Sequence, residues 1–382
     1  MSEIKVNSIK GVGASTAAIT VNNSDGSCTA NLTNRTNKNL VTNGACLIAQ
    51  RGTSSTTSGY GSVDRFRVFF TGVDENPTQA QADVVAGTTP YTSGFRKCLK
   101  VTNGNQTSGA GAGDYIVIRT TLEAQDMANS GWNYTSSSSN VTLQFWIKSS
   151  VAQNFYGRLQ TQDGTTYNYP FETGSLSADT WTKITKTIPG NSNLTFNNDN
   201  GGGLRVEIIP FYGTDYTASP SLNTWAAHSS SSRTPDYTST WFTTNDATLE
   251  ITGLQLEVSD HATDFEHRSF AQELALCRRY YFGDAGSGLI GFGRTNSQSM
   301  MFSIQFPTEM RSNPSMSLTT TGALTIAEPG ESNFYPSSCT IAVAHNGTKS
   351  AAFYLNSTTN NSVTKGDNLF LTADYLKFDS EL

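Results

Sequence analysis

Residues 252–283 read TGLQLEVSDHATDFEHRSFAQELALCRRYYFG and place a strand, a polar corner and a helix in one stretch. Leu254, Leu256 and Val258 occupy alternate positions, so they fall on one face of the strand. Most of the sequence on either side reads as short strands joined by polar loops. The stretch is therefore predicted to join two β modules.

The helix of this stretch has a predicted start, end and apolar side. Ser269 and Gln272 are three residues apart, which is the spacing of a capping box at a helix start. Gly283 is expected to end the helix, because glycine readily adopts the left-handed conformation found there. Steps of four, three and four residues define one apolar stripe: Phe270, Leu274, Cys277 and Tyr281.

The composition favours a folded protein made of many short strands. Of 382 residues, 36% are hydrophobic, 10% are aromatic and only 15% are charged, whereas disordered chains carry high net charge and few aromatic residues. Two or three domains are expected at this length. The formal net charge of −6 gives no electrostatic reason to expect nucleic-acid binding, which needs clustered Lys and Arg.

Residues 38–268 have the pattern of a large jelly-roll β-sandwich. The clearest strand is 141–148, where Val141, Leu143, Phe145 and Ile147 point inward and Gln144 and Trp146 point outward. Phe66, Val68 and Phe70 similarly alternate with Arg65, Arg67 and Phe69. About ten strands separated by turn residues suit a double-sheet jelly roll. The best runs are 63–70, 95–101, 115–120, 141–148, 155–160, 165–171, 181–188, 203–209 and 247–256.

The remaining segments complete an all-β fold with one linking α-helix. Residues 269–283 form that helix, and residues 284–382 are predicted to form a smaller C-terminal β-sandwich, with alternation clearest over Met300–Phe306. Residues 1–37 contain too few apolar side chains to build a core alone. This N-terminal segment is therefore expected to dock on a partner or on a second copy of itself.

Four stretches resemble tail-fibre and fibre-like virion proteins of phages, especially those of marine cyanophages. They are the start MSEIKVNSIK (1–10), the run KNLVTNGACLIAQRG (38–52), the acidic and aromatic corner ATDFE (262–266) and the helix 273–281. The resemblance implies a jelly roll like that of carbohydrate-binding modules, with residues 38–52 as its first strand. It also implies that residues 1–37 attach the protein to the virion and that the fibre is a homotrimer.

Glycan binding would need flat aromatic faces for sugar C–H surfaces, with amide or charged groups beside them for hydroxyls. The same aromatic residues are also common inside strands and at subunit interfaces, so both alternatives stay open. The candidates for contact with host surface polysaccharide are Trp146, Tyr156, Arg158, Tyr167, Tyr169, Tyr212 and Trp225.

The helix is a candidate oligomer interface. At about 13 residues it is marginally stable alone in water, so its apolar side should pack on another surface. The stripe Phe270, Leu274, Cys277 and Tyr281 is expected to meet either the sandwich or two further copies of the chain.

Signatures of catalysis, metal binding and membrane insertion are not found. The four histidines lack HExxH spacing, GxSxG is absent, and the five cysteines form no CxxC pair. Carbohydrate-binding modules often hold a structural calcium, but residues 43–50 contain no acid and Gln255 stands where an acid would help. No run approaches the ~20 apolar residues of a membrane span, and residues 1–10 lack a signal-peptide core. No cofactor and no metal are expected.

The sequence thus predicts a phage virion fibre protein, either a tail fibre or a receptor-binding tip, assembled in the host cytoplasm. It would contact host surface glycans without catalysis, so it is not expected to be an enzyme. One alternative is a structural capsid or vertex fibre that recognises no ligand. A lesser alternative is a glycan depolymerase, for which carboxylate pairs such as Asp260 and Asp264 would have to lie at a suitable separation.

Overall fold

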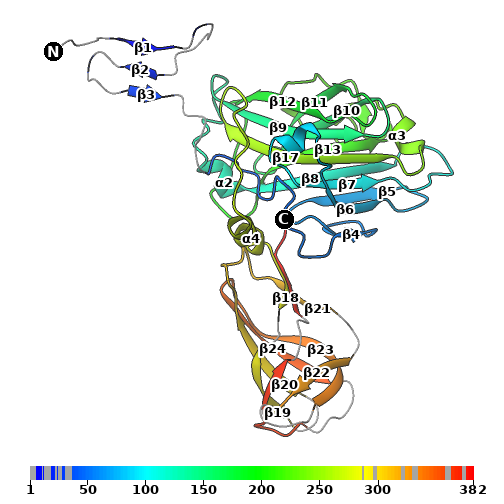
Figure 1. Ribbon diagram of the computed structural model, residues 1–382, viewed down its shortest axis with the longest axis vertical. Helices are drawn as coiled ribbons and strands as arrows, with labels where there is room; N and C mark the ends of the chain where they lie inside the picture. The colour runs from blue at the N-terminus through cyan, green and yellow to red at the C-terminus, as the bar shows by residue number, and fades with distance from the viewer. Residues whose placement is uncertain are drawn as a thin grey trace.

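The computed structural model describes residues 6–10, 12, 19–21, 24, 28–30, 37–285, 288–295, 299–319, 323–328, 334–357, 363–371 and 376–382. As predicted, the fold is all-β with only short helices. A large β-sandwich lies above a smaller β unit in Figure 1, with the helix α4 (Phe270–Arg278) between them. Within the described part of the chain, no helix has both the length and the apolar character needed to cross a bilayer.

The large domain consists of two six-stranded antiparallel sheets, named here after their central strands. The β13 sheet has the order β15-β11-β10-β13-β8-β5, and the β17 sheet has the order β12-β9-β17-β7-β6-β4. The strands of the β13 sheet are β5 (Arg67–Thr71), β8 (Tyr115–Glu123), β10 (Asn154–Thr161), β11 (Tyr167–Ser175), β13 (Gly202–Tyr212) and β15 (Ala226–Ala227). Those of the β17 sheet are β4 (Ser54–Ser55), β6 (Thr78–Asp83), β7 (Lys97–Thr102), β9 (Asn140–Ser149), β12 (Thr182–Pro189) and β17 (Thr248–Val258).

Short elements fill the connections of this domain. They are the helices α1 (Thr89–Thr92), α2 (Ala124–Ala128) and α3 (Thr240–Thr243), and the parallel pair β14 (Thr217–Ala218) and β16 (Thr234–Pro235). Each of the nine runs predicted from alternation, from 63–70 to 247–256, contributes a strand. The sequence analysis missed β6, because its sequence TQAQAD carries no large apolar side chain to reveal an inward face.

The sandwich core forms where the inner faces of the two sheets meet. Val141, Leu143, Phe145 and Ile147 of β9 are at most 1% exposed, which confirms the predicted alternation. Phe145 approaches Phe171 of the opposite sheet, with ring centroids 6.4 Å apart. The inner faces are therefore closed by large apolar side chains, and only the outer faces and the loops can carry a site.

The predicted first strand over residues 38–52 is wrong, because turns and irregular backbone occupy this run. Asn43 and Cys46 have φ of 60° and 57°, which an extended strand cannot include. The run still lies along β17: the Leu40 amide donates to Leu256 O at 2.9 Å, and the Leu256 amide donates to Asn39 Oδ1 at 3.1 Å. An asparagine side chain thus replaces part of a strand's hydrogen bonding.

The predicted helix start is confirmed, and the predicted helix end is wrong. Ser269 and Gln272 form both hydrogen bonds of the capping box. The helix α4 ends at Arg278, and Gly283 lies in the strand β18 (Tyr281–Ala285). Tyr281 therefore belongs to a strand rather than to the helix.

The predicted apolar stripe of the helix is also partly wrong. Cys277 and Tyr281 are 0% and 3% exposed, so they are buried within the chain and cannot form an interface with other copies. Phe270 is 61% exposed and Leu274 is half-buried. The inner position next to Cys277 is taken by Glu273, whose carboxylate accepts the Asn43 amide proton and lies 3.6 Å from Arg268. Hydrogen bonding, rather than hydrophobicity, orients this helix.

The C-terminal domain takes the form of a small barrel rather than two facing sheets. Six strands close in the order β19-β20-β24-β23-β22-β25, and a three-stranded sheet β18-β26-β21 adjoins them. Phe302 and Phe353 stack in its core with ring centroids 6.1 Å apart. The strands are β19 (Ile290–Thr295), β20 (Ser299–Gln305), β21 (Ser315–Leu318), β22 (Ala323–Ala327), β23 (Phe334–Asn346), β24 (Ser350–Ser357), β25 (Asn368–Leu371) and β26 (Leu376–Asp379).

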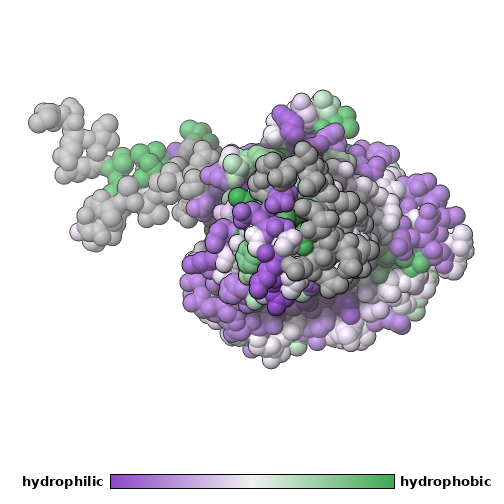
Figure 2. Space-filling view, turned by 90° about the horizontal axis from the view of Figure 1, so that it is seen from below, coloured by the Kyte–Doolittle hydropathy of each residue, from purple (hydrophilic) through white to green (hydrophobic). Residues whose placement is uncertain are grey.

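The N-terminal segment forms a small separate sheet from β1 (Ser8–Ile9), β2 (Ile19–Val21) and β3 (Cys28–Ala30). Val6 and Ile9 are 45% and 54% exposed. Figure 2 shows a compact hydrophobic patch on this sheet, which projects from the side of the molecule. Exposed apolar side chains of this kind favour docking on a partner.

Buried ion pairs join the end of the chain to the large sandwich. Arg65 is 2% exposed, pairs with Glu381, and lies 3.3 Å from the ring centroid of Tyr280. Arg51 pairs with the same carboxylate at 3.3 Å and with Asp379 at 2.9 Å. The end of β26 and the residues after it therefore neutralise charges that belong to the sandwich.

Replacing the shared carboxylate, Glu381→Gln, should destabilise the sandwich by about 3 kcal/mol, because a buried arginine loses its partner. Urea unfolding followed by tryptophan fluorescence measures this change, since all five tryptophans lie within residues 132–241. The matched control Glu309→Gln breaks the exposed pair with Lys349 and should cost less than about 1 kcal/mol. Equal stabilities of the two variants would contradict the expectation.

Candidate functional site

A small cavity opens on the outer face of the β17 sheet, beside Trp146. Its volume is about 270 Å³. Aromatic side chains and polar residues from four chain segments line it. The lining residues are Ser93, Phe95, Gln144, Trp146, Lys183, Gly253, Asp264, Phe265 and His267. We call this cavity the Trp146 pocket.

Strand alternation and register position the base of the pocket. Trp146 points outward because Phe145 and Ile147, its neighbours in β9, face the core. In the register of the sheet, Trp146 lies opposite Lys183 of β12 on one side and Thr252 of β17 on the other. These side chains therefore share the outer face.

Phe95, Phe265 and His267 form an aromatic wall. The ring centroids of Phe95 and Phe265 are 4.8 Å apart in an edge-to-face arrangement, and His267 lies 5.0 Å from each. The His267 Nε2 atom is 3.0 Å from Ser93 O, which can only accept a proton. Gly253 has φ of +66°, and a Cβ there would lie 2.7 Å from the Phe95 ring. Glycine is required at that position for the wall to close.

Gln144, which lines the pocket, carries an unsatisfied acceptor. Its side chain is 2% exposed, and Nε2 donates to Thr263 O at 2.7 Å. The Oε1 atom is buried and has no hydrogen-bond donor among the described residues. A buried acceptor without a donor costs about 1–3 kcal/mol, so a hydroxyl group bound in the pocket would be favoured at this atom.

The corner after β17 holds the aromatic wall in place. The Glu257 carboxylate accepts from Thr263 N at 2.9 Å and from Thr263 Oγ1 at 2.6 Å. The Gln255 amide oxygen accepts from Glu266 N at 2.8 Å. The residues that carry the sequence resemblance therefore have a structural role, since they fix the backbone on both sides of Phe265.

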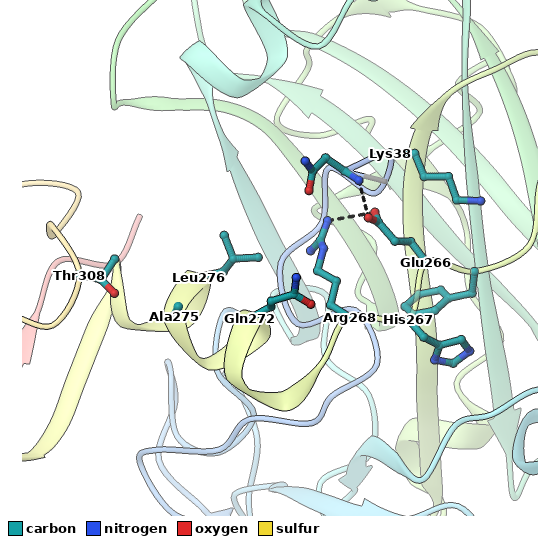
Figure 3. A pocket seen from close by; sticks show the side chains of 10 residues that line it. Lys38, Glu266, His267, Arg268, Gln272, Ala275, Leu276 and Thr308 are labelled. Atoms are coloured by element: carbon teal, nitrogen blue, oxygen red, sulfur yellow. Dashed lines mark hydrogen bonds and ion pairs between the residues drawn. The ribbon is translucent and has the colours of Figure 1, made fainter. Parts of the chain in front are cut away.

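A second cavity of about 570 Å³ lies between this corner, α4 and Thr308 of the C-terminal domain. Phe265 and His267 line both cavities. Figure 3 shows Glu266 and Arg268 on one side of it and Leu276 and Thr308 on the other. The Glu266 carboxylate is engaged by Arg268 at 3.3 Å, and it also accepts amide protons from Asn37 and Asn39. The charged groups of this larger cavity are thus already paired.

The outer face of the β13 sheet carries charged side chains. Glu207 of β13 lies between Arg158 of β10 and Arg119 of β8 in the register, and each arginine contacts it at 2.5 Å. Burial raises the pKa of Glu207, but the charges of Arg158 and Arg119 outweigh burial and lower it to about 2. Glu207 is therefore ionised at neutral pH and cannot serve as a general acid.

Three predicted glycan-binding residues contribute to the sandwich interior instead. Tyr169 is 2% exposed and Trp225 is 7% exposed, with ring centroids 5.2 Å apart. The Trp225 indole donates to Pro189 O at 2.7 Å. Tyr167 is half-buried and packs against the same core. The prediction is wrong for Tyr169 and Trp225, because both side chains are buried in the core of the sandwich.

Three others lie on the outer face of the β13 sheet. Tyr156 is half-buried, with its ring 4.9 Å from Tyr237. Arg158 and Tyr212 are 2% and 1% exposed, so the prediction of glycan contact is wrong for both. Arg158 is held by Glu207, and the loop after β13 covers Tyr212. Of the predicted set, Trp146 alone lines the Trp146 pocket.

Sequence reasoning missed the other residues of the pocket. Gln144 and Trp146 were both predicted to point outward from one strand, which is a partial signal. Phe95 lies 51 residues before Trp146 and Phe265 lies 119 residues after it, so the fold, rather than any local pattern, brings the three side chains together.

Within the described part of the chain, no three His, Cys, Asp or Glu side chains gather as a metal site would require. The described cysteines Cys46, Cys98, Cys277 and Cys339 are free and buried. Burial raises the pKa of the Cys46 thiol to about 12, so this group stays protonated at neutral pH.

No protein-family model matches the chain, and no curated protein sequence does. Similar solved structures include the enzymatically active domain of tailspike protein 4 of bacteriophage CBA120, with 9% identity and a TM-score of 0.31, over 58% of this chain and 21% of that one. The N-terminal cellulose-binding domain of Cellulomonas fimi β-1,4-glucanase C has 9% identity and a TM-score of 0.28, over 56% and 98%. A putative sugar-binding protein of Bacteroides thetaiotaomicron has 12% identity and a TM-score of 0.28, over 58% and 100%. Likenesses this distant do not show what the present chain binds.

The variant Glu207→Gln should lose about 3 kcal/mol of stability at pH 7, because two buried arginines lose their shared carboxylate. The folded-state pKa of about 2 lies below the usual value of 4.5, so the contribution is complete above pH 4.5 and is lost as the pH falls through 2. The difference between the wild type and the variant should therefore shrink as the pH is lowered from 5 to 2. Urea unfolding across this range measures it.

Asp83→Asn is the matched control, since its pair with Lys97 is exposed. It should change stability by less than about 1 kcal/mol at every pH. If the stability difference between the wild type and Glu207→Gln stayed constant down to pH 2, this would contradict the lowered pKa of Glu207.

Proposed function

We propose that the large sandwich binds a glycan of the host surface in the Trp146 pocket, without catalysis. The observation that carries the proposal is that Gln144, a residue lining a pocket walled by aromatic rings, has a buried and unsatisfied Oε1 atom. A sugar supplies both a hydroxyl donor for this atom and C–H surfaces for the rings.

The remaining features of the pocket suit a sugar unit. Lys183 and Asp264 line it and offer a donor and an acceptor for further hydroxyl groups. Its volume of about 270 Å³ lies just below the range of ~300–1,000 Å³ for drug-sized ligands. One sugar residue of a polymer therefore fits better than a long oligosaccharide, and the rest of the polymer would lie across the open surface.

Recognition without hydrolysis is supported by the distribution of carboxylates. Glycosidases pair two carboxyl groups across the scissile bond. Asp264 is the one carboxylate among the residues that line the Trp146 pocket. A glycan depolymerase remains the lesser alternative, and release of reducing ends from host polysaccharide by the purified chain would establish it.

The variant Trp146→Ala should weaken glycan binding at least about 10-fold, because buried aromatic contacts dominate binding energies. A glycan array of host-envelope polysaccharides identifies the ligand, and calorimetry then measures the affinity. Trp181→Ala is the matched control: Trp181 is also a half-buried tryptophan beside the β17 sheet, but it does not line the pocket. Equal affinities of Trp146→Ala and the wild type, with the fold intact, would refute this site.

The protein that carries this site would be a virion fibre, either a tail fibre or a receptor-binding tip, located in virions assembled in the host cytoplasm. The support is the sequence resemblance of residues 1–10, 38–52 and 262–281, together with the exposed apolar side chains of the N-terminal sheet. That sheet would attach the fibre to other virion proteins. Several weak sites on one fibre would act together by multivalency. A capsid or vertex fibre without recognition is the alternative, and an array with no bound glycan would favour it.

The fibre is expected to be a homotrimer. With Cys277 and Tyr281 buried inside the chain, the helix side chains left for contact with other copies are Phe270 and Leu276, which are 61% and 38% exposed. Light scattering should give a mass near three times 41.1 kDa. The double variant Phe270→Ser and Leu276→Ser should lower this mass, whereas a monomeric wild type at micromolar concentration would rule out the trimer.

A further inference from the structure

The outer face of the β13 sheet carries an arginine from each of four neighbouring strands. Arg158 of β10, Glu207 of β13, Arg119 of β8 and Arg67 of β5 lie opposite one another in the register and form one row across the sheet. In the next row, Arg205 of β13 lies opposite Gln160 of β10. Directly opposite residues share a face, so these side chains form one surface, which we call the arginine face.

The arginine face has more positive than negative charge. Glu207 is ion-paired with both Arg119 and Arg158. Arg67 and Arg205 form no ion pair among the described residues. This excess of positive charge is notable in a chain with a formal net charge of −6. It is located on the sheet opposite the Trp146 pocket.

The guanidinium group of Arg205 has an N–H donor without an acceptor among the described residues. Its NH1 group donates to Gln160 Oε1 at 3.2 Å, while its Nε atom is buried and has no partner among the described residues. Burial and the charge of Arg119 lower the pKa of Arg205 to about 10. An anion placed beside this guanidinium would satisfy the free N–H group and offset the repulsion from neighbouring arginines.

The surroundings of the arginines suit a sugar polymer. Phe69 supports two of the guanidinium groups, since Arg119 and Arg67 lie 4.3 Å and 5.3 Å from its ring centroid. Gln162 is half-buried, and its Nε2 atom lies 3.2 Å from Gln160 Oε1. Guanidinium groups held on an aromatic ring can bind carboxylate or sulfate in a bidentate manner, and amide groups beside them can bind hydroxyls.

We infer that the arginine face is a second glycan site, which binds an acidic polysaccharide through Arg67 and Arg205. Arg67 and Arg205 come from strands two positions apart in the sheet, about 10 Å at the usual strand spacing. An extended polymer with repeated negative charges can reach both. A nucleic acid is less well matched, because the flanking amides offer hydroxyl partners and the face lacks the lysine-rich stripe of a phosphate-binding surface.

Calorimetry with the full chain tests this inference with four probes: polygalacturonate for carboxylate, chondroitin sulfate for sulfate, dextran as a neutral polymer, and poly(dT) as a nucleic acid. At least one acidic polysaccharide should bind, more weakly as salt is raised. The variants Arg67→Gln and Arg205→Gln should each reduce its affinity about 10-fold. Arg96→Gln is the control, because Arg96 is exposed on another part of the domain and should leave the affinity unchanged. Unchanged thermal unfolding verifies that each variant is folded.

Each other result overturns the inference. Dextran or poly(dT) binding as tightly as the acidic polysaccharides would show that the face does not select acidic sugars, and full affinity in both arginine variants would place the site elsewhere. The Trp146→Ala variant separates this inference from the proposed function: it should keep its affinity for the acidic polymer. If Trp146→Ala abolishes acidic-polymer binding and the arginine variants do not, the Trp146 pocket stands and the second site fails.

Discussion

Three carboxylates, those of Glu257, Glu266 and Glu273, hold the structure together at the corner between β17 and α4. They accept backbone amide protons from Thr263, Asn39 and Asn43, respectively. These donors belong to the corner itself and to the irregular run that opens the sandwich. Backbone N–H groups that a sheet partner would normally satisfy are thus paired with side-chain oxygens. The helix, the last strand and the start of the sandwich depend on this network for their relative positions.

The network also explains which features the sequence could predict. Alternation along β9 correctly placed Phe145 inward and Trp146 outward, because period two is a local property of a strand. The face of α4 was predicted from hydrophobicity, and the structure instead buries Glu273 and exposes Phe270. A carboxylate can be buried at an inner position only where hydrogen-bond donors are available to it. The Asn43 amide, which donates to Glu273, lies 230 residues earlier in the chain. No local pattern reveals such a partner.

The candidate sites were predictable to a similar, limited extent. The sequence analysis placed Arg67 and Phe69 together on one side of their strand, opposite Phe66 and Val68. It could not show that β8 and β13 would bring Arg119 and Arg205 beside them, because strand order is a property of the whole sheet. For Tyr212, the sequence could not show whether the side chain is exposed. It does lie on the outer face, but the loop after β13 covers it.

The ion pair between Arg65 and Glu381 has a consequence for synthesis. The two residues are 316 positions apart, so a ribosome that adds ~5–20 residues per second makes the carboxylate on the order of tens of seconds after the arginine. During that interval the nascent sandwich would have to keep Arg65 hydrated, because a buried guanidinium without a counter-charge is strongly unfavourable. The sandwich, which is translated first, can therefore reach its final packing only after the segment around Glu381 has been synthesised and has docked on it.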